Sequence, residues 1–471
     1  MLSLRLWSVR HARGLRRVYG LVSRLAPRLA PLARAIGWQR SAAALRPLER
    51  AAKKLLFDCR MCGQCVLSAT GMACPMNCAK EMRNGPCGGV RADGHCEVEP
   101  RLPCAWVEAG AGARRIAGDP LAPATPPLAA LDQRLRGRSS WIAILQGQAA
   151  PAFLPAPLQR STPPGPLGVL ERACNAGRFV VTVEVAPPDC ADPRTLLARA
   201  DKFRGLVDAI NITDGAGGNC HMSSVAASAI LAAHGHTPVY QVACRDRNRI
   251  AIQGDILGAA ALGVQNILCL TGDDVSQGDQ PQAKPVFDLD AVSLLQLARA
   301  MCEQGQFASG RKLQKAPQLF LGATVNPFVP PYLERIANLE KKILAGARFI
   351  QTQFCFDLRM LEDFMREVRR RELHQRAHII VGVGTLGSAK ALAWMARHVP
   401  GVHVPAQLLS RIEQAADQQA QAKACCIETI QALAGMEGVA GVHLMGHKNE
   451  DVLAEIIAEC GLRRQNRLPT N

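Results

Sequence analysis

From residue 179 onward, short apolar runs rich in Val and Ile alternate with longer amphipathic segments. The runs are five to seven residues long and lie at 179–185, 207–213, 238–244, 266–271, 319–325, 349–354, 378–383 and 441–445. Runs of this length that are apolar on both faces are typical of buried parallel strands. The segments between them, such as 192–203, 290–304, 330–346 and 357–373, repeat apolar residues at helical spacing.

Eight strand–helix units predict an α/β fold, a (β/α)8 TIM barrel over residues 166–471. A doubly wound open sheet is the alternative, because strand order cannot be inferred from one sequence. In a TIM barrel the active site lies where the strands end, and polar residues stand at three of these ends. They are Glu184 in the first run, Asp273 directly after the fourth, and Gln353 near the end of the sixth. We therefore expect a site at this rim.

A separate cysteine-rich segment precedes the barrel. Of the 18 cysteines in the chain, eight fall between residues 59 and 104, namely Cys59, Cys62, Cys65, Cys74, Cys78, Cys87, Cys96 and Cys104. The first three form C-x2-C-x2-C and the fourth precedes a proline, a pattern that resembles the thiolate ligands of iron–sulfur ferredoxins. The last four suit a second cluster or a four-thiolate zinc site. Purely structural zinc in both sets is the alternative.

Proline content and charge divide the rest of the chain. Ten prolines lie between residues 119 and 166, and they predict an extended linker over 116–165, after a cysteine-rich metal-binding domain at 51–115. Residues 1–50 contain eleven arginines and one acidic residue, so this extension carries most of the formal net charge of +17. It is either an organelle presequence, or a basic surface helix or poorly ordered extension that touches an anionic surface or a partner.

Composition excludes several classes of protein. With 48% hydrophobic and 20% charged residues, the chain is neither wholly disordered nor fibrous. No apolar run reaches the roughly 18 residues of a membrane span. Basic residues are not interleaved with aromatic ones after residue 50, which argues against nucleic-acid binding. We expect a cytoplasmic protein that is not transmembrane and forms a homo-oligomer.

Several motifs resemble the methylenetetrahydrofolate reductase family, whose members are flavin-dependent TIM barrels. They are VEVAPP at 183–188, LTGDD at 270–274, NLEKKILAGARFIQTQFCFD at 338–357 and GVHLMGHKN at 441–449, and the resemblance covers about residues 166–462. The segments CRMCGQC, CPMNC, NGPCGG and Cys104-Ala105-Trp106 resemble the cysteine-rich domain that accompanies this reductase in many bacteria.

The resemblance implies reduction of 5,10-methylenetetrahydrofolate to 5-methyltetrahydrofolate. Glu184 would be the acid that protonates the amine released on ring opening, which requires a raised pKa. Asp273 would tune flavin and pterin, and Gln353 would hydrogen-bond the substrate or nicotinamide. Thr213 and Gln241 would line the flavin, and Lys342 would contact its phosphate side. The flavin would be FAD, with FMN possible.

Three positions depart from the motifs of many family members. Thr271 replaces an Arg, Gln241 replaces a His, and Ala389 replaces an aromatic that stacks on nicotinamide. These departures leave two electron sources open, NAD(P)H or a ferredoxin-like donor acting through the cysteine domain. The competing functions are a pterin-binding TIM-barrel methyltransferase and an electron-transfer partner without reductase activity.

Overall fold

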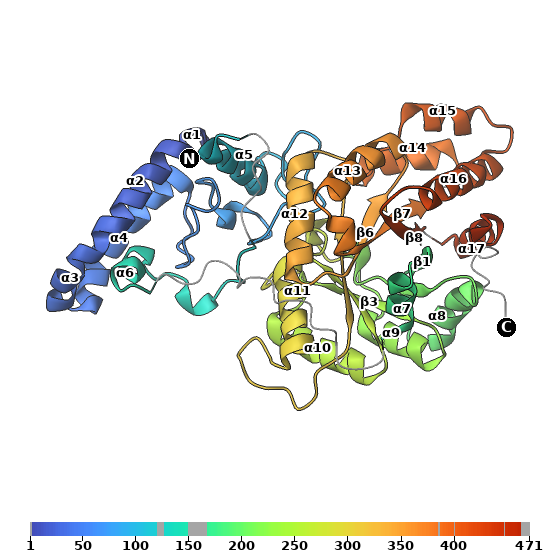
Figure 1. The fold of residues 1–471 in the computed structure, drawn as a ribbon, viewed down its shortest axis with the longest axis horizontal. Helices are drawn as coiled ribbons and strands as arrows, with labels where there is room; N and C mark the ends of the chain where they lie inside the picture. The colour runs from blue at the N-terminus through green and yellow to red at the C-terminus, as the bar shows by residue number, and fades with distance from the viewer. Residues whose placement is uncertain are drawn as a thin grey trace.

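The computed structural model describes residues 2–119, 127–148, 167–384, 387–399, 401–446 and 448–462. Helices of the N-terminal part and the cysteine-rich segment form one body, and the barrel forms the other (Figure 1). The two bodies meet where α5 and α12 lie side by side. The cysteine-rich segment and the barrel are therefore two folded parts in contact with each other.

The barrel consists of eight parallel strands in sequential order, with β8 paired to β1. The strands are β1 (Val180–Val185), β2 (Ala209–Ile212), β3 (Pro238–Ala243), β4 (Asn266–Leu270), β5 (Phe320–Val325), β6 (Phe349–Phe354), β7 (His378–Gly384) and β8 (Val439–Met445). This closed order confirms the predicted TIM barrel and excludes the open sheet. The eight predicted apolar runs each overlap one strand, because buried parallel strands are apolar on both faces.

Helices cover the outside of the barrel. They are α8 (Pro193–Ala200), α9 (Ser224–Ala233), α10 (Arg249–Ala261), α11 (Ala291–Arg299), α12 (Tyr332–Ala345), α13 (Leu358–Arg370), α14 (Ala389–His398), α15 (Ala406–Glu413), α16 (Gln418–Ala434) and α17 (Glu450–Glu459). Side-chain oxygens of Asp192, Asn248, Asp290, Asp357 and Asp417 cap five of them at their N-termini. Each cap supplies an acceptor for backbone N–H groups that the helix leaves unpaired.

An additional helix closes one end of the barrel. In α7 (Val169–Asn175), Leu170, Ala173 and Cys174 pack against the first inward-facing side chains of the strands, including Phe320 and Phe349. This layer is apolar and almost completely buried. The strand N-termini are therefore sealed, and polar interior groups are reached only from the opposite end.

The N-terminal extension folds onto the cysteine-rich segment. It forms α1 (Leu2–Arg10), α2 (Ala12–Leu25), α3 (Ala30–Ile36) and α4 (Trp38–Phe57), with a 3-10 turn at Ala26–Leu29. Arg5 makes a buried ion pair with Glu108 in α5 (Ala105–Ala117), at 3.0 Å. The boundary that we placed at residue 50 lies inside α4, so one helix joins the extension to the first cysteine.

Part of the proline-rich stretch also packs on this body. Residues 120–126 and 149–166 of the predicted linker lie outside the described residues, whereas 127–148 are described. Leu128 is fully buried, and Ser140, at the start of α6 (Ser140–Leu145), donates to the buried carboxylate of Glu49 at 2.7 Å. The same carboxylate accepts from Lys53 at 2.6 Å. Residues 127–148 therefore belong structurally to the cysteine-rich body.

Asp290 fixes the cysteine-rich body to the barrel. Its Oδ2 accepts from the backbone N–H groups of Arg83 at 2.9 Å and Asn84 at 2.8 Å. Its Oδ1 accepts from the N–H of Ser293 at 2.9 Å and so caps α11. The residue is 2% exposed. One buried carboxylate thus satisfies donors from both bodies.

We expect Asp290→Ala to lower the free energy of unfolding by roughly 3 kcal/mol, because buried N–H groups lose their acceptor. Asp417→Ala is the matched control, since it removes a cap of α16 that contacts no other body. That control should cost about 1 kcal/mol. Urea unfolding of both variants measures the difference, and equal losses would show that Asp290 is only a helix cap.

None of the described helices is both long enough and apolar enough to cross a bilayer.

Candidate functional site

A polar layer lies inside the barrel directly above the apolar seal. Asn211 donates to Gln351 at 2.7 Å, and Gln351 donates to Thr182 at 3.3 Å. The Thr182 hydroxyl lies 2.9 Å from Nδ1 of His443. All four side chains are buried. Such a closed network of mutual partners holds each side chain in one orientation.

Glu184 lies one inward-facing position above this layer. It follows Thr182 by two residues in β1, so both side chains point to the same face of the strand. Its Oε2 accepts from Nε2 of Gln241 at 3.4 Å and lies 4.0 Å from Nε2 of His443. The carboxylate side chain is 27% exposed. Glu184 therefore lies at the open end of the barrel, with one long hydrogen bond from Gln241 and with His443 nearby.

Thr213 and Gln353 stand at the ends of β2 and β6, on opposite sides of the barrel rim. Thr213 follows β2 and is 4% exposed, and its hydroxyl has no hydrogen-bond partner among the described residues. Gln353 belongs to β6, where its Oε1 accepts from the N–H of Phe354 at 3.0 Å. A buried hydroxyl without a partner is costly, so the position of Thr213 fits a polar ligand atom.

Asp273 lies in the loop after β4. Its Oδ2 accepts from the N–H of Gly217 at 2.9 Å, which joins this loop to the one after β2. Gly272 has a φ of 99°, a conformation that favours glycine, and a Cβ there would lie 2.8 Å from the Cβ of Arg245. This sharp turn brings Asp273 to the same rim as Glu184.

Lys342 belongs to α12, outside the barrel strands, and its side chain reaches the neighbouring strand β5. Its Nζ donates to the backbone oxygen of Thr324 in β5 at 2.6 Å. Burial lowers the pKa of Lys342 to about 8, against the opposing effects of Asp290 and Cys87. The ammonium group therefore lies between α12 and β5, on the side of the barrel that faces the cysteine-rich body.

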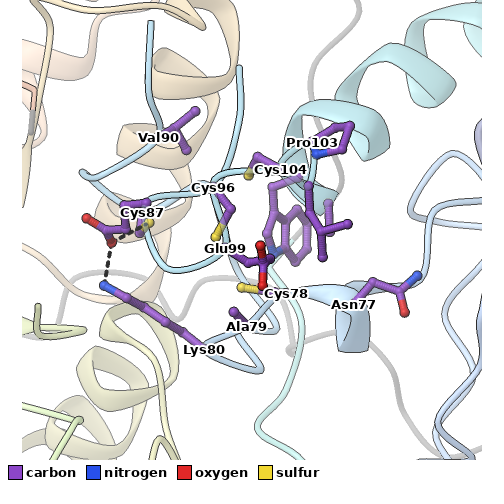
Figure 2. A pocket seen from close by; sticks show the side chains of 14 residues that line it. Asn77, Cys78, Ala79, Lys80, Cys87, Val90, Cys96, Glu99, Pro103 and Cys104 are labelled. Carbon is purple, nitrogen blue, oxygen red and sulfur yellow. Dashed lines mark hydrogen bonds and ion pairs between the residues drawn. The ribbon is translucent and has the colours of Figure 1, made fainter. Parts of the chain in front are cut away.

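The cysteines fall into two sets of four, each around its own cavity. Cys59, Cys62, Cys65 and Cys74 line one cavity, and Cys78, Cys87, Cys96 and Cys104 line the other, where the side chains surround the space seen in Figure 2. Within the described ranges, no three His, Cys, Asp or Glu side chains are arranged so as to hold a metal ion as they stand. In the described residues, the four cysteines of each set thus line a cavity but are not positioned as a ready-made metal site.

Burial shapes the chemistry of these thiols. It raises the pKa of Cys78 to about 11 and that of Cys104 to about 12, and the nearby Cys96 raises both further. In the other set burial raises the pKa of Cys59 and Cys74. Such thiols stay protonated at neutral pH unless a metal or cation compensates the negative charge.

A buried lysine accompanies each set. Lys53 is 5% exposed; burial lowers its pKa, but the neighbouring Cys65 and its ion pair with Glu49 raise the pKa above its usual value. Lys80 is 4% exposed, and Cys87 and Glu97 raise its pKa. Each lysine is also paired with a carboxylate, Lys53 with Glu49 and Lys80 with Glu97, so each cysteine set lies beside a buried ion pair.

Lys80 also connects the second cysteine set to the rim of the barrel. Its Nζ lies 2.5 Å from Oε1 of Glu97 and donates to the backbone oxygen of Gly272 at 2.8 Å. Glu97 accepts from the thiol of Cys87 at 3.4 Å, as the dashed lines in Figure 2 show. Contacts therefore run from Cys87 through the side chains of Glu97 and Lys80 to the turn at Gly272, which directly precedes Asp273.

Sequence reasoning missed His443 and Lys80. His443 stands in the apolar run of β8, and the alternation of side chains along a strand would have placed it inside the barrel. Lys80 lies two residues after Cys78 in a loop, where nothing in the sequence distinguishes it from a solvated lysine. Only the packing of the two bodies reveals its position.

Comparison with family sequence models gives two matches. The model described as methylenetetrahydrofolate reductase matches residues 169–461, and the one described as methylene-tetrahydrofolate reductase C terminal matches residues 40–119. The second match precedes the first in this chain. No curated protein sequence matches significantly.

Solved structures give distant matches to the barrel. A Clostridium thermocellum protein described as binding two copies of 5-methyl-5,6,7,8-tetrahydrofolic acid is 14% identical, with a TM-score of 0.43 over 62% of this chain and 98% of that one. A 2,3-dimethylmalate lyase is 13% identical, with a TM-score of 0.37 over 64% and 88%. Yersinia pestis DHPS with a pterine-sulfa conjugate is 14% identical, with a TM-score of 0.32 over 61% and 95%.

Proposed function

The chain belongs to the methylenetetrahydrofolate reductase family of oxidoreductases, and from this premise we propose that it reduces 5,10-methylenetetrahydrofolate to 5-methyltetrahydrofolate with a bound flavin. The observation that carries the proposal is the position of Glu184. This carboxylate stands at the open end of the barrel, where it accepts from Gln241 and lies 4.0 Å from His443. The opposite end is sealed by apolar side chains.

Residues at the rim fit a flavin. The buried hydroxyl of Thr213 lacks a partner, and Gln241 keeps an amide oxygen for a second hydrogen bond. We propose that these two side chains hold the flavin, as FAD or FMN. When bound, the flavin would supply the electron pair that reduces the one-carbon unit. Lys342 already donates to Thr324, so contact with the phosphate side would require its ammonium group to turn outward.

Glu184 is proposed as the general acid. Opening of the five-membered ring of the substrate breaks a carbon–nitrogen bond and leaves negative charge on the amine nitrogen. A carboxylic acid within hydrogen-bond reach of that nitrogen supplies the proton and leaves an iminium carbon ready for reduction. Gln241 donates to this carboxyl group and His443 lies near it, and these two side chains are proposed to orient it for proton transfer.

Gln353 and Asp273 are proposed to orient the folate. The amide of Gln353 has an unused N–H2 group that suits the carbonyl and ring nitrogens of a pterin. Asp273 is fixed by the N–H of Gly217 and leaves its second oxygen for the donor groups of the pterin. Together with Glu184, these side chains come from β1, β4 and β6, which converge at one rim.

The two cysteine sets are proposed to hold iron–sulfur clusters that deliver electrons to the rim. Each set of four cysteines lines its own cavity, and the C-x2-C-x2-C spacing of the first set favours a cluster over zinc. The chain Cys87–Glu97–Lys80–Gly272 brings the second set against the loop of Asp273. This contact supports a ferredoxin-like donor acting through the cysteine domain, with NAD(P)H as the other possible source.

Metal and flavin analysis of protein purified without oxygen tests this function. We expect one flavin per chain in the visible spectrum and iron with acid-labile sulfide in the cysteine domain. Zinc without iron would eliminate the electron-inlet role and leave the reductase. Failure to bind FAD or FMN after careful reconstitution would contradict the reductase itself and favour a pterin-binding methyltransferase.

A further inference from the structure

Exposed apolar side chains are concentrated at the N-terminal end of the molecule. Twelve of the nineteen large hydrophobic side chains that are exposed in the described residues lie before residue 56. Scattered exposed hydrophobic residues are normal, but a contiguous group of them marks a contact surface. The group lies on the body that carries no part of the proposed active site.

Seven of these side chains form one stripe along α2, the following 3-10 turn and α3. The α2–α3 stripe consists of Val18, Leu21, Val22, Leu25, Leu29, Leu32 and Ile36. Successive members are separated by one, three or four residues, so they follow one side of the helical path. Their exposed fractions range from 43% at Leu25 to 60% at Leu32. Another side of the same helices is already packed, through Ala12 and Ala33.

The surface beside the stripe is strongly cationic. Arg16, Arg17, Arg24 and Arg28 are exposed, and none has an acidic partner in the part of the chain that the structure describes. The one acidic residue before position 51 is Glu49, which is buried and bound to Lys53. The positive charge next to the stripe is therefore not compensated within this body.

We propose that the α2–α3 stripe docks on an anionic phospholipid surface. A helix with an aliphatic stripe and a cationic flank lies in the plane of such a surface, with its apolar side chains among the acyl chains and its arginines at the phosphates. A second copy would place the same arginines against each other, so self-association is opposed by charge. α3 lies at the end of the molecule away from the barrel, so docking leaves the rim accessible (Figure 1).

Vesicle co-sedimentation of the full chain tests this proposal. We compare phosphatidylcholine vesicles with vesicles that also contain phosphatidylglycerol, using the wild type and Leu21→Ser/Leu29→Ser. The wild type should bind only the anionic vesicles, and the variant should lose about tenfold in affinity for each substituted side chain. Ile250→Ser/Leu262→Ser is the matched control, because both side chains are exposed aliphatics on or beside α10 of the barrel. It should bind like the wild type.

A charge variant separates the apolar from the electrostatic contribution. Arg24→Gln/Arg28→Gln should also weaken binding, and 1 M salt should do the same because the Debye length falls to about 3 Å. All four proteins should melt at the same temperature, since the substituted side chains are exposed. The proposal is overturned if the wild type ignores anionic vesicles, if the control loses binding equally, or if the stripe instead mediates dimers or binding of an acidic protein in the absence of lipid.

Discussion

Replacing Glu184 by glutamine is expected to lower the rate of folate reduction by about 10²- to 10⁴-fold, the usual contribution of a general acid. Glutamine keeps the size of the side chain and can still contact Gln241, but it cannot supply a proton at neutral pH. Reduction of the bound flavin by its electron donor should be almost unchanged, because that step needs no proton from this position. Stopped-flow measurement of the two half-reactions separates these effects.

Glu413→Gln is the matched control for this substitution. Glu413 is an exposed residue at the end of α15, and its replacement should leave both half-reactions at the wild-type rate. If Glu184→Gln retained full folate reduction, the assignment of Glu184 as the acid would be rejected. If it abolished flavin binding as well, the residue would be part of the binding site and its role in proton transfer would need another test.

Replacing Cys74 by serine is expected to remove the metal of the first cysteine set. Cys74 is 7% exposed and lines the cavity together with Cys59, Cys62 and Cys65. Metal binding to such thiolates contributes directly to folding, so its loss should also loosen the small core around Leu67, Met72 and Met76. Metal content should fall by about half if both sets are filled with the same cluster.

Hydrogen exchange and elemental analysis measure both effects. Exchange should accelerate in residues 59–78 and stay slow in the barrel, because α11 and α12 have their own apolar core. Cys190→Ser provides the comparison, since Cys190 is an exposed barrel cysteine outside both sets. An unchanged metal content in Cys74→Ser would contradict the assignment of this residue as a ligand.

The barrel could be predicted from the sequence because each strand is recognisable from its own residues. Val180–Val185 and Asn266–Leu270 are mostly apolar and rich in Val, Ile and Leu, a signal that needs no knowledge of their neighbours. Their closure into a barrel required the structure, since register between strands depends on contacts far apart in the chain. Family membership and the enzyme class were also predicted correctly, from motifs at the strand ends.

The placement of the two bodies could not be predicted. Asp290 reads as an ordinary helix cap in the sequence, yet it also binds Arg83 and Asn84, which precede it by about 200 residues. From the sequence, Lys80 would be expected to be a solvated lysine in a loop, although its Nζ donates to the backbone oxygen of Gly272. Long-range contacts between irregular segments leave no periodic pattern, so no local rule identifies them.

From the sequence we identified only some of the side chains that the structure brings together at the candidate site. Glu184 stood out as a charge in an apolar strand, and the structure places it beside Gln241, another predicted site residue. Thr182, Asn211 and His443 look like tolerated polar residues in strands until the barrel brings them together. The roles of Glu184, Asp273, Gln353, Thr213, Gln241 and Lys342 remain predictions.

The most direct test of the central claim is a single-turnover reaction. The protein, reduced without oxygen and carrying flavin, is mixed with 5,10-methylenetetrahydrofolate, and both flavin absorbance and folate products are followed. We predict that 5-methyltetrahydrofolate forms as the flavin and the clusters become oxidised, with one product for every two electrons that they release. Flavin that stays reduced while the folate is recovered unchanged would contradict the assignment of this barrel as a folate reductase.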